Sequence, residues 1–263
     1  MEFKAVIFDL DGCLYRGEIP IEGASESLEE LRKMGFKIMF LTNNATKTVE
    51  EYTSRLNKIG IKCLEEEVLT SGLATSIYLA EKYGSVKVLP VGGKALEEEL
   101  RRKGHNVLNW REKCEADFVV ACLDFDFNYE KLKNACQAVY NGARFIATNA
   151  DPTVPVENRL IPGAGAIVAA ISKATGRKPL VVGKPSQIIM KVALKRLGVE
   201  GFETVVVGDR LDTDVKAGWR INALTVLVLT GATSLRDLER WRGVKPSLVL
   251  ESVRELPKAL RRL

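Results

Sequence analysis

The stretch AVIFDLDG, residues 5–12, decides the fold class of this chain. Four apolar residues lead directly into two carboxylates, Asp9 and Asp11, and then into Gly12. An apolar run without polar alternation is typical of a strand that is buried on both faces of a parallel sheet. Ligands of such sheets bind beyond the carboxyl ends of the strands. The stretch therefore predicts a central strand with a functional site at its end.

The same order of apolar run, polar residues and helix recurs outward along the chain. Helical patterns over residues 24–34 and 46–59 flank a second apolar run at 38–41. Further apolar runs, each followed by a helical pattern, lie at residues 180–182, 204–207 and 224–229. Strands that alternate with helices predict an α/β fold with a doubly wound, Rossmann-like parallel sheet.

The middle of the chain has an alternation of its own. Strand patterns at 86–91, 118–123 and 145–147 alternate with helical patterns at 95–103, 129–140 and 167–175. We therefore expect a smaller α/β domain over residues 83–179, inserted into a core domain of residues 1–82 and 180–263. No low-complexity linker marks the boundaries, so they follow from the elements on either side.

The composition is that of an ordinary globular protein. Among 263 residues, 39 Lys and Arg stand against 34 Asp and Glu, and 46% of the chain is hydrophobic. Because basic and acidic residues alternate, we expect solvated helix faces and no nucleic-acid partner. The longest apolar run is under half the roughly 20 residues that cross a bilayer. Charges also interrupt the N-terminal stretch where a signal peptide would be apolar. We therefore expect no membrane association and a cytoplasmic location.

The thiols and the single histidine are not expected to carry chemistry. The five cysteines, at positions 13, 63, 114, 122 and 136, contain no Cys-x-x-Cys pair, which favours reduced, mostly buried thiols over disulfides or a zinc site. His105 follows Gly104, and we expect it in a surface loop.

Four predicted core strands end in residues that can carry chemistry. In chain order these residues are Asp9 and Asp11, then Thr42, Asn43 and Asn44, then Lys184, and finally Asp209 and Asp214. Taken singly, each group is explained by a turn or a helix cap. Taken together, the groups lie after separate strands of one sheet, so we expect their side chains to converge on one crevice.

The charges of this set predict a magnesium site. Four carboxylates face one ammonium group, that of Lys184, and such a cluster stays ionised only with a cation present. Oxygen ligands with room for water favour Mg²⁺ over zinc. With the metal bound, little net negative charge would remain in the site, which would suit a metal-bridged phosphate held by Lys184 and Thr42.

These residues, in this order, resemble the haloacid dehalogenase superfamily of phosphatases, which use an aspartate nucleophile. DLDG at 9–12, LTN at 41–43, Lys184 and GDRLDTD at 208–214 match its four motifs. The last of these strings, with TNN at 42–44, resembles in particular the 4-nitrophenylphosphatase-like (NagD-like) subgroup, whose large α/β cap lies between the second and third motifs. Cys13 stands where Thr or Val is commoner, which does not touch the chemistry.

The resemblance implies a Mg²⁺-dependent phosphomonoester hydrolase that acts on a small phosphometabolite. Asp9 would attack phosphorus and become an aspartyl-phosphate, while Asp11 would act as general acid and then general base. The implied metal ligands are Asp9, Asp11 through its backbone carbonyl, Asp209, and Asp214 directly, through water or by orienting Asp209. The implied phosphate-binding residues are Thr42, Asn43, Asn44 and Lys184. Caps of this subgroup often pair, so the resemblance also implies a homodimer through the cap.

Other interpretations stay open on the sequence alone. A phosphomutase or a non-catalytic phosphometabolite sensor could use the same fold, whereas a phospho-accepting signalling domain would need a third strand-end Asp and would lack so large an insertion. Within the cap, Asp124, Asn149 and Asp151 fit either capping residues or contacts to the leaving group. PGAG at 162–165 lacks the third glycine of a dinucleotide motif and indicates a turn before a helix.

Overall fold

The computed structural model describes residues 2–111, 115–156 and 159–263. It divides the chain into two compact units, which we call the core unit and the second unit. The core unit comprises Met1–Thr42, Glu50–Leu69 and Lys184–Leu263, and the second unit comprises Asn43–Val49 and Thr70–Gly183. Residues 83–179, for which we predict an inserted domain, fall within the bounds of the second unit, which also includes residues on both sides.

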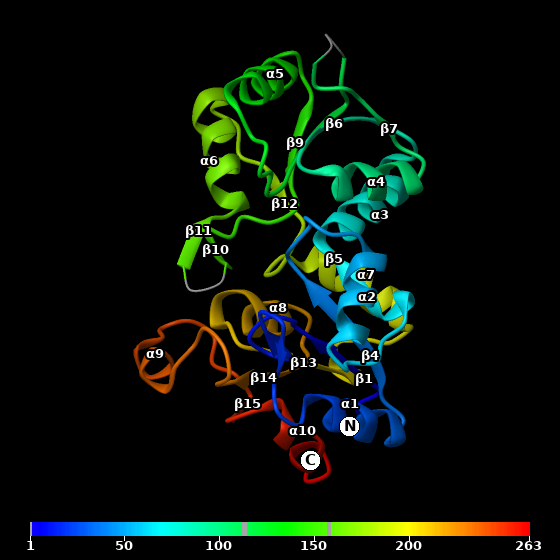
Figure 1. Cartoon of the computed structure of the whole chain (residues 1–263), viewed down its shortest axis with the longest axis vertical. Helices are drawn as coiled ribbons and strands as arrows, with labels where there is room; N and C mark the ends of the chain where they lie inside the picture. Colours follow the sequence, from blue (N-terminus) through cyan, green and yellow to red (C-terminus); the bar gives the residue numbers. More distant parts are fainter. Residues whose placement is uncertain (1, 112–114, 157–158) are drawn as a thin grey trace. The chain divides into compact units, whose positions relative to one another are not determined.

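The core unit is built on one sheet of six strands. Its strands are β1 (Ala5–Phe8), β4 (Lys37–Thr42), β5 (Val68–Thr70), β13 (Thr204–Gly208), β14 (Leu224–Val228) and β15 (Leu248–Leu250). Their order is β15-β14-β13-β1-β4-β5, and every pairing from β4 to β15 is parallel. All four residues of β1 are buried, as the apolar run predicts for a central strand. Figure 1 shows the blue and orange parts of the chain side by side in this sheet.

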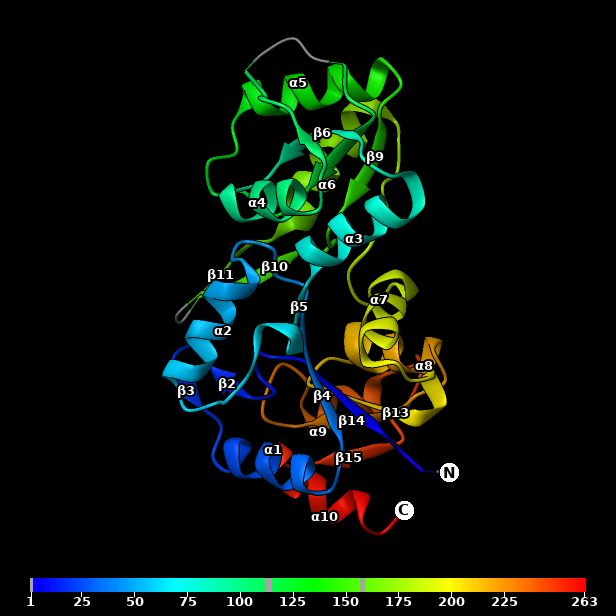
Figure 2. The same cartoon turned by 90° about the vertical axis from the view of Figure 1, so that its right-hand side faces the viewer.

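Helices surround the core sheet, and some of them pack on its strands. They are α1 (Ala24–Lys33), α2 (Val49–Lys58), α7 (Gln187–Leu197), α8 (Lys216–Arg220), α9 (Leu235–Arg240) and α10 (Leu256–Leu260). In Figure 2, α1 and α10 lie on one side of the strands, and α7 and α8 lie on the other. A short hairpin, β2 (Tyr15–Arg16) with β3 (Ile19–Pro20), follows the end of β1. The predicted doubly wound α/β architecture is confirmed.

The second unit has its own parallel sheet, in the order β12-β9-β8-β6-β7. These strands are β6 (Lys87–Val91), β7 (Asn106–Val107), β8 (Phe118–Ala121), β9 (Arg144–Ala147) and β12 (Leu180–Val181). Figure 1 shows α5 (Tyr129–Tyr140) and α6 (Ala164–Thr175) on one side of β6 and β9, with α3 (Ser71–Tyr83) and α4 (Lys94–Arg102) on the other. A two-stranded antiparallel hairpin, β10 (Thr153–Val156) with β11 (Arg159–Pro162), precedes α6.

The assignment of residues 180–182 to the core sheet is wrong. Only Leu180 and Val181 form a strand, and they pair with Ile146 and Ala147 of β9 in the second unit. Leu180 is 42% exposed, so this strand lies at the edge of its sheet rather than in a buried centre. An apolar run indicates a strand, but it carries no signal for which of two parallel sheets the strand joins.

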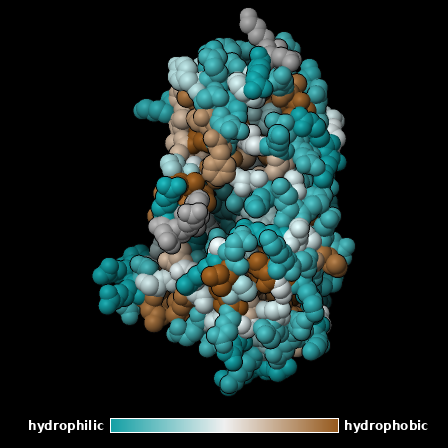
Figure 3. Space-filling view, in the orientation of Figure 1, coloured by the Kyte–Doolittle hydropathy of each residue, from teal (hydrophilic) through white to brown (hydrophobic). Residues whose placement is uncertain are grey.

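Surface charges are paired or solvated, as the alternating pattern predicts. The face shown in Figure 3 is mostly hydrophilic, with hydrophobic side chains in small groups. The basic cluster at the end of α4 forms ion pairs one turn apart, Arg101 with Glu97 and Arg102 with Glu98. No helix in the described part of the chain combines the length and apolar character needed to cross a bilayer.

The thiols largely follow expectation, but the histidine does not. Cys13, Cys63, Cys122 and Cys136 are buried and reduced, while Cys114 lies outside the described residues. The prediction of an exposed His105 is wrong, because its side chain is buried and its Nε2 lies 2.9 Å from the Ser76 carbonyl oxygen. A lone histidine after a glycine therefore links the turn between α4 and β7 to α3.

Candidate active site

Three carboxylates meet at the switch point of the core sheet. Asp9 directly follows β1 and Asp209 directly follows β13, two strands that pair side by side although they lie at opposite ends of the sequence. Asp214 lies in the π-helical turn Leu211–Val215 that comes next. One carboxylate oxygen from each of these three residues lies within 4.8 Å of the other two. Three carboxylates thus meet at the carboxyl ends of neighbouring strands, where ligands of parallel sheets bind.

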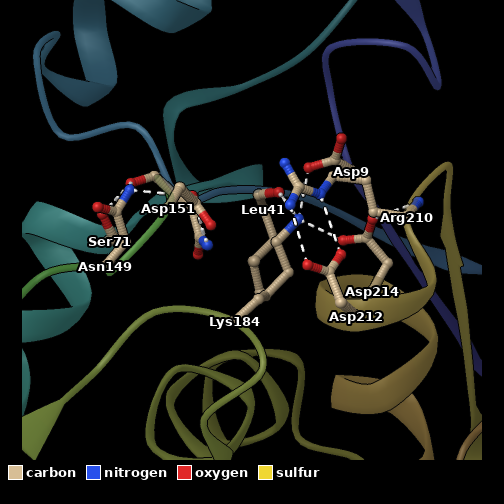
Figure 4. A network of polar contacts seen from close by, with 10 residues as sticks. Asp9, Leu41, Ser71, Asn149, Asp151, Lys184, Arg210, Asp212 and Asp214 are labelled. Carbon is tan, nitrogen blue, oxygen red and sulfur yellow. Dashed lines mark hydrogen bonds and ion pairs between the residues drawn. The ribbon is translucent and has the colours of Figure 1, made fainter. Parts of the chain in front are cut away.

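Lys184 joins this centre from the beginning of the last core segment. Its ammonium group forms an ion pair with Asp9, lies 2.7 Å from Asp214 Oδ1 and donates to the Leu41 carbonyl oxygen at 3.3 Å. Its side chain is only 4% exposed. Figure 4 shows Lys184 between Asp9 and Asp214. The lysine therefore neutralises part of the buried negative charge.

Burial and mutual repulsion disturb the ionisation of the cluster. Burial raises the pKa of Asp9 to about 8, against the pull of Lys184 and with the help of Asp214 and Asp209. Burial and the charge of Asp214 raise the pKa of Asp209 to about 6. Burial by itself lowers the pKa of Lys184, but Asp214 and Asp9 raise it above its ordinary value. Three close carboxylates that ionise with difficulty beside one ammonium group fit a divalent cation with oxygen ligands.

A loop that the sequence analysis missed fixes Asp209. Its Oδ2 accepts a hydrogen bond from the Ala232 main-chain N–H at 2.6 Å, and its carbonyl oxygen accepts one from Thr233 at 3.2 Å. A Cβ added at Gly231 would lie 2.0 Å from Asp209 Oδ2, so only glycine lets the loop approach this closely. Gly12, with φ of +82°, lies against the same carboxylate. In the sequence, only Gly231 could have indicated that this loop approaches Asp209, but a glycine after a strand also fits an ordinary turn.

Asp11 faces solvent beside the β2–β3 hairpin. It forms an isolated bridge with Tyr15 and is exposed. Partial desolvation raises the pKa of Asp11, while the charges of Arg55 and Arg16 and the Gly12 N–H lower it. Arg55 stacks on the Tyr15 ring at 4.7 Å and donates to the Gly17 carbonyl oxygen at 2.7 Å, which ties α2 to this hairpin. A carboxyl group so placed can exchange protons with solvent.

Thr42 ends β4, and the two asparagines that follow belong to the second unit. A hydrogen bond links the buried side chains of Thr42 and Tyr52. The Asn43 amide donates to Asp151 Oδ2 at 3.1 Å. The Asn44 carboxamide oxygen accepts from the Thr46 N–H at 2.8 Å and from its hydroxyl at 2.7 Å, which stabilises a turn. Direct contacts thus join Asp9, Asp214 and Lys184. The side chains of Asn43 and Asn44 bond instead to Asp151 and Thr46, respectively.

The chain matches two family models. A model described as haloacid dehalogenase-like hydrolase matches residues 6–106, and one described as HAD-hydrolase-like matches residues 181–256. The matched segments contain Asp9, Asp11, Thr42, Lys184 and Asp209. The resemblance inferred from the motifs is confirmed.

Relatives cover nearly the whole chain. A Staphylococcus saprophyticus protein named acid sugar phosphatase is 38% identical over 258 residues, which are 98% of each chain. The p-nitrophenyl phosphatase from Archaeoglobus fulgidus has a similar structure, with a TM-score of 0.92, 37% identity, and coverage of 98% of this chain and 100% of that chain. NagD from Escherichia coli K-12 gives a TM-score of 0.89 at 36% identity, with 97% and 98% covered. The chain therefore belongs to the haloacid dehalogenase-like hydrolases and is a phosphatase of their NagD-like group.

Proposed function

We propose that this phosphatase is a Mg²⁺-dependent phosphomonoesterase that acts through an aspartyl-phosphate on Asp9. The observation that carries the proposal is the group of Asp9, Asp209 and Asp214, whose oxygens lie within 4.8 Å of one another beside the buried Lys184. A carboxylate nucleophile must be ionised, and burial raises the pKa of Asp9 to about 8. A bound cation would favour the ionised form, which is why we expect the metal to be required.

The carboxylates of Asp9 and Asp209 and the main-chain carbonyl of Asp11 are the ligands that would hold Mg²⁺. Arg210 N–H donates to one oxygen of Asp214 at 3.1 Å, and Lys184 lies 2.7 Å from the other. We therefore assign Asp214 to the metal through water. When bound, Mg²⁺ supplies positive charge that offsets the charge of the phosphoryl oxygens.

Asp9 and Asp11 divide the chemistry between them. An Asp9 carboxylate oxygen forms a bond to phosphorus as the phosphorus–oxygen bond to the leaving group breaks, and Asp11 gives its proton to the departing oxygen. Water then attacks the phosphorus of the aspartyl-phosphate, and Asp11 takes the proton of that water. Orthophosphate leaves and Asp9 returns as a carboxylate. The exposed position of Asp11 suits both proton transfers.

Thr42, Asn43 and Lys184 would bind the transferred phosphoryl group. Fixed donors are needed there because negative charge spreads over its equatorial oxygens in the transition state. Lys184 is the buried cation of the cluster, and Thr42 ends the strand next to β1. We assign Asn44 to the turn with Thr46 that follows these donors.

We propose that the second unit is the cap and that it selects a small phosphorylated metabolite. Because several relatives are named acid sugar phosphatase, sugar phosphates are the first class to test. The homodimer through the cap and the cytoplasmic location stay predictions.

Hydrolysis of 4-nitrophenyl phosphate tests the reaction. We expect turnover with Mg²⁺, none with EDTA, and none for Asp9→Asn, which keeps the shape of the side chain and removes the nucleophile. The variant must melt cooperatively near the wild-type temperature, so that lost turnover reports chemistry rather than folding. A folded wild type that binds Mg²⁺ without turnover would overturn a general phosphomonoesterase and leave a mutase, a sensor or a cap too selective to admit this substrate.

A further inference from the structure

Asn43 is held at both its main chain and its side chain by residues far away in the sequence. Its carbonyl oxygen accepts hydrogen bonds from Ser71 Oγ at 2.5 Å and from Asn149 Nδ2 at 2.6 Å. Its carboxamide nitrogen donates to Asp151 Oδ2 at 3.1 Å, and Asn149 Nδ2 lies 3.2 Å from that same oxygen. Figure 4 shows Ser71, Asn149 and Asp151 in this network. We call Asn149 and Asp151 with their bonds to Asn43 the Asn43 clasp.

The glycines of PGAG, residues 162–165, support the clasp from behind. Gly163 N–H donates to the Pro152 carbonyl oxygen at 2.8 Å, and Gly165 N–H donates to that of Asp151 at 2.9 Å. A Cβ added at Gly163 would lie 2.4 Å from the Asp151 carbonyl oxygen, and one at Gly165 would lie 2.6 Å from that of Ala150. The glycine motif therefore serves close packing of the loop after β9 on the start of α6, not a nucleotide.

The clasp also packs against the place where the chain leaves the second unit. A Cβ added at Gly183 would lie 2.6 Å from Asn43 Oδ1 and 2.5 Å from the Thr148 carbonyl oxygen. Asn43 begins one segment of the second unit, Ser71 lies next to the start of another, and Gly183 ends the last. One polar cluster of the second unit thus includes or adjoins three of the four residues at which its two segments begin and end.

We propose that Asp151 and Asn149 are positioning residues for phosphoryl transfer, acting through Asn43. Asn43 is covalently joined to Thr42, and the proposed function on which this inference rests assigns both to the phosphoryl group. Because its carbonyl and its carboxamide are both bonded, the side chain of Asn43 and its peptide with Asn44 are held in place directly beside the peptide that links it to Thr42. Donors that stay in place do not have to be ordered during the reaction.

Oxygen Oδ2 of Asp151 defines the variants that test the clasp. Both amide nitrogens meet this one oxygen, so Asp151→Asn can present its own carboxamide oxygen there and keep the geometry without the charge. Asp151→Ala removes the acceptor altogether. Asp117→Ala is the matched control, because Asp117 also accepts a hydrogen bond, from Lys87 N–H at 2.7 Å, but lies at the amino end of β8, whereas the clasp follows the carboxyl end of β9.

The experiment measures kcat and KM for 4-nitrophenyl phosphate, the Mg²⁺ activation constant and the melting temperature of each variant. We expect Asp151→Ala to lower kcat on the order of 10- to 100-fold, as small misplacements of catalytic groups do. Its Mg²⁺ activation constant stays at the wild-type value, because the metal ligands belong to the core unit. Asp151→Asn recovers most of kcat, and Asp117→Ala matches the wild type.

A folded Asp151→Ala with wild-type kcat would overturn the proposal, as would Asp151→Asn with a loss equal to that of Asp151→Ala. If Asp151→Ala fails to fold, Asn149→Ala decides by the same kcat criterion. Titration with inorganic phosphate in the presence of Mg²⁺ is the readout independent of turnover. A wild type without turnover overturns the proposed function, and weaker phosphate binding by Asp151→Ala then still supports the clasp, whereas unchanged binding refutes it.

Discussion

Replacing Gly231 by alanine tests whether the loop after β14 fixes Asp209 for the metal. The added Cβ would lie 2.0 Å from Asp209 Oδ2, whereas real Cβ contacts essentially never fall below 3.0 Å. The carboxylate or the loop must therefore move by about 1 Å, although ligand distances in metal sites vary by only about 0.2 Å. The move also disturbs the 2.6 Å bond from Ala232 N–H. Gly231 has no positive φ, so its backbone itself accepts alanine.

The expected cost is a 10- to 100-fold weaker affinity for Mg²⁺, the usual effect of losing support for a metal ligand, or about 1.4–2.7 kcal/mol. Calorimetric titration with Mg²⁺, and the Mg²⁺ dependence of 4-nitrophenyl phosphate hydrolysis, measure this affinity directly. Gly93→Ala is the matched control, because Gly93 has φ of −80° and an added Cβ meets nothing within 4 Å. A folded Gly231→Ala that binds Mg²⁺ within about twofold of the wild type would refute the reasoning, since that is well inside the expected loss.

Three further predictions concern buried charges. Lys184→Met removes the ammonium group that pairs with Asp9 and Asp214. We expect the free energy of unfolding without metal to fall by about 3–5 kcal/mol and Mg²⁺ to restore part of it. An equal loss with and without Mg²⁺ would contradict this prediction. Lys131→Met breaks the buried pair with Asp124, 2.8 Å apart, and we expect a similar loss in the free energy of unfolding, measured by urea denaturation. The added change Asp124→Leu recovers part of this stability, and a double variant no more stable than Lys131→Met would contradict the reasoning. Burial holds the pKa of Asp9 at about 8 and that of Asp209 at about 6, against an ordinary 3.8. The metal-free folded state therefore binds more protons than the unfolded chain, and its stability falls as pH rises through this range. The rise in melting temperature on adding Mg²⁺ is thus larger at pH 8 than at pH 5, and the opposite order would refute the assignment.

Local patterns in the sequence predicted most elements of the fold. The range 129–140 is the observed α5, because Asn128 caps its first turn and apolar residues recur on one face. The four apolar residues before Asp9 were enough to predict the first strand. The strand-end rule placed Asp9 and Asp209 together, because their strands are neighbours in the sheet.

Contacts between distant residues could not be predicted in the same way. Helix α3 was missed because its buried face includes Thr75 and Ser76, whose hydroxyls donate to the helix's own carbonyls at 2.7 and 3.0 Å. Their polar character hides the apolar face on which periodicity depends. Lys184 was predicted at the site for the wrong reason, since the strand before it lies in the other sheet. The partner of Asp151 was not visible in the sequence, because it lies 108 positions away.

The place of β1 between β4 and β13 has a consequence for how the protein is made. A ribosome delivers the N-terminal strand first, but the neighbour on one of its edges is residues 204–208. Until that segment emerges, a strand with four buried apolar residues presents a bare edge to the cell, the kind of edge at which chains aggregate. The second unit, whose sheet uses only residues between 87 and 181, has all its strands earlier. A nascent chain can therefore complete its second sheet while its first still lacks Asp209 and Asp214 of the carboxylate cluster.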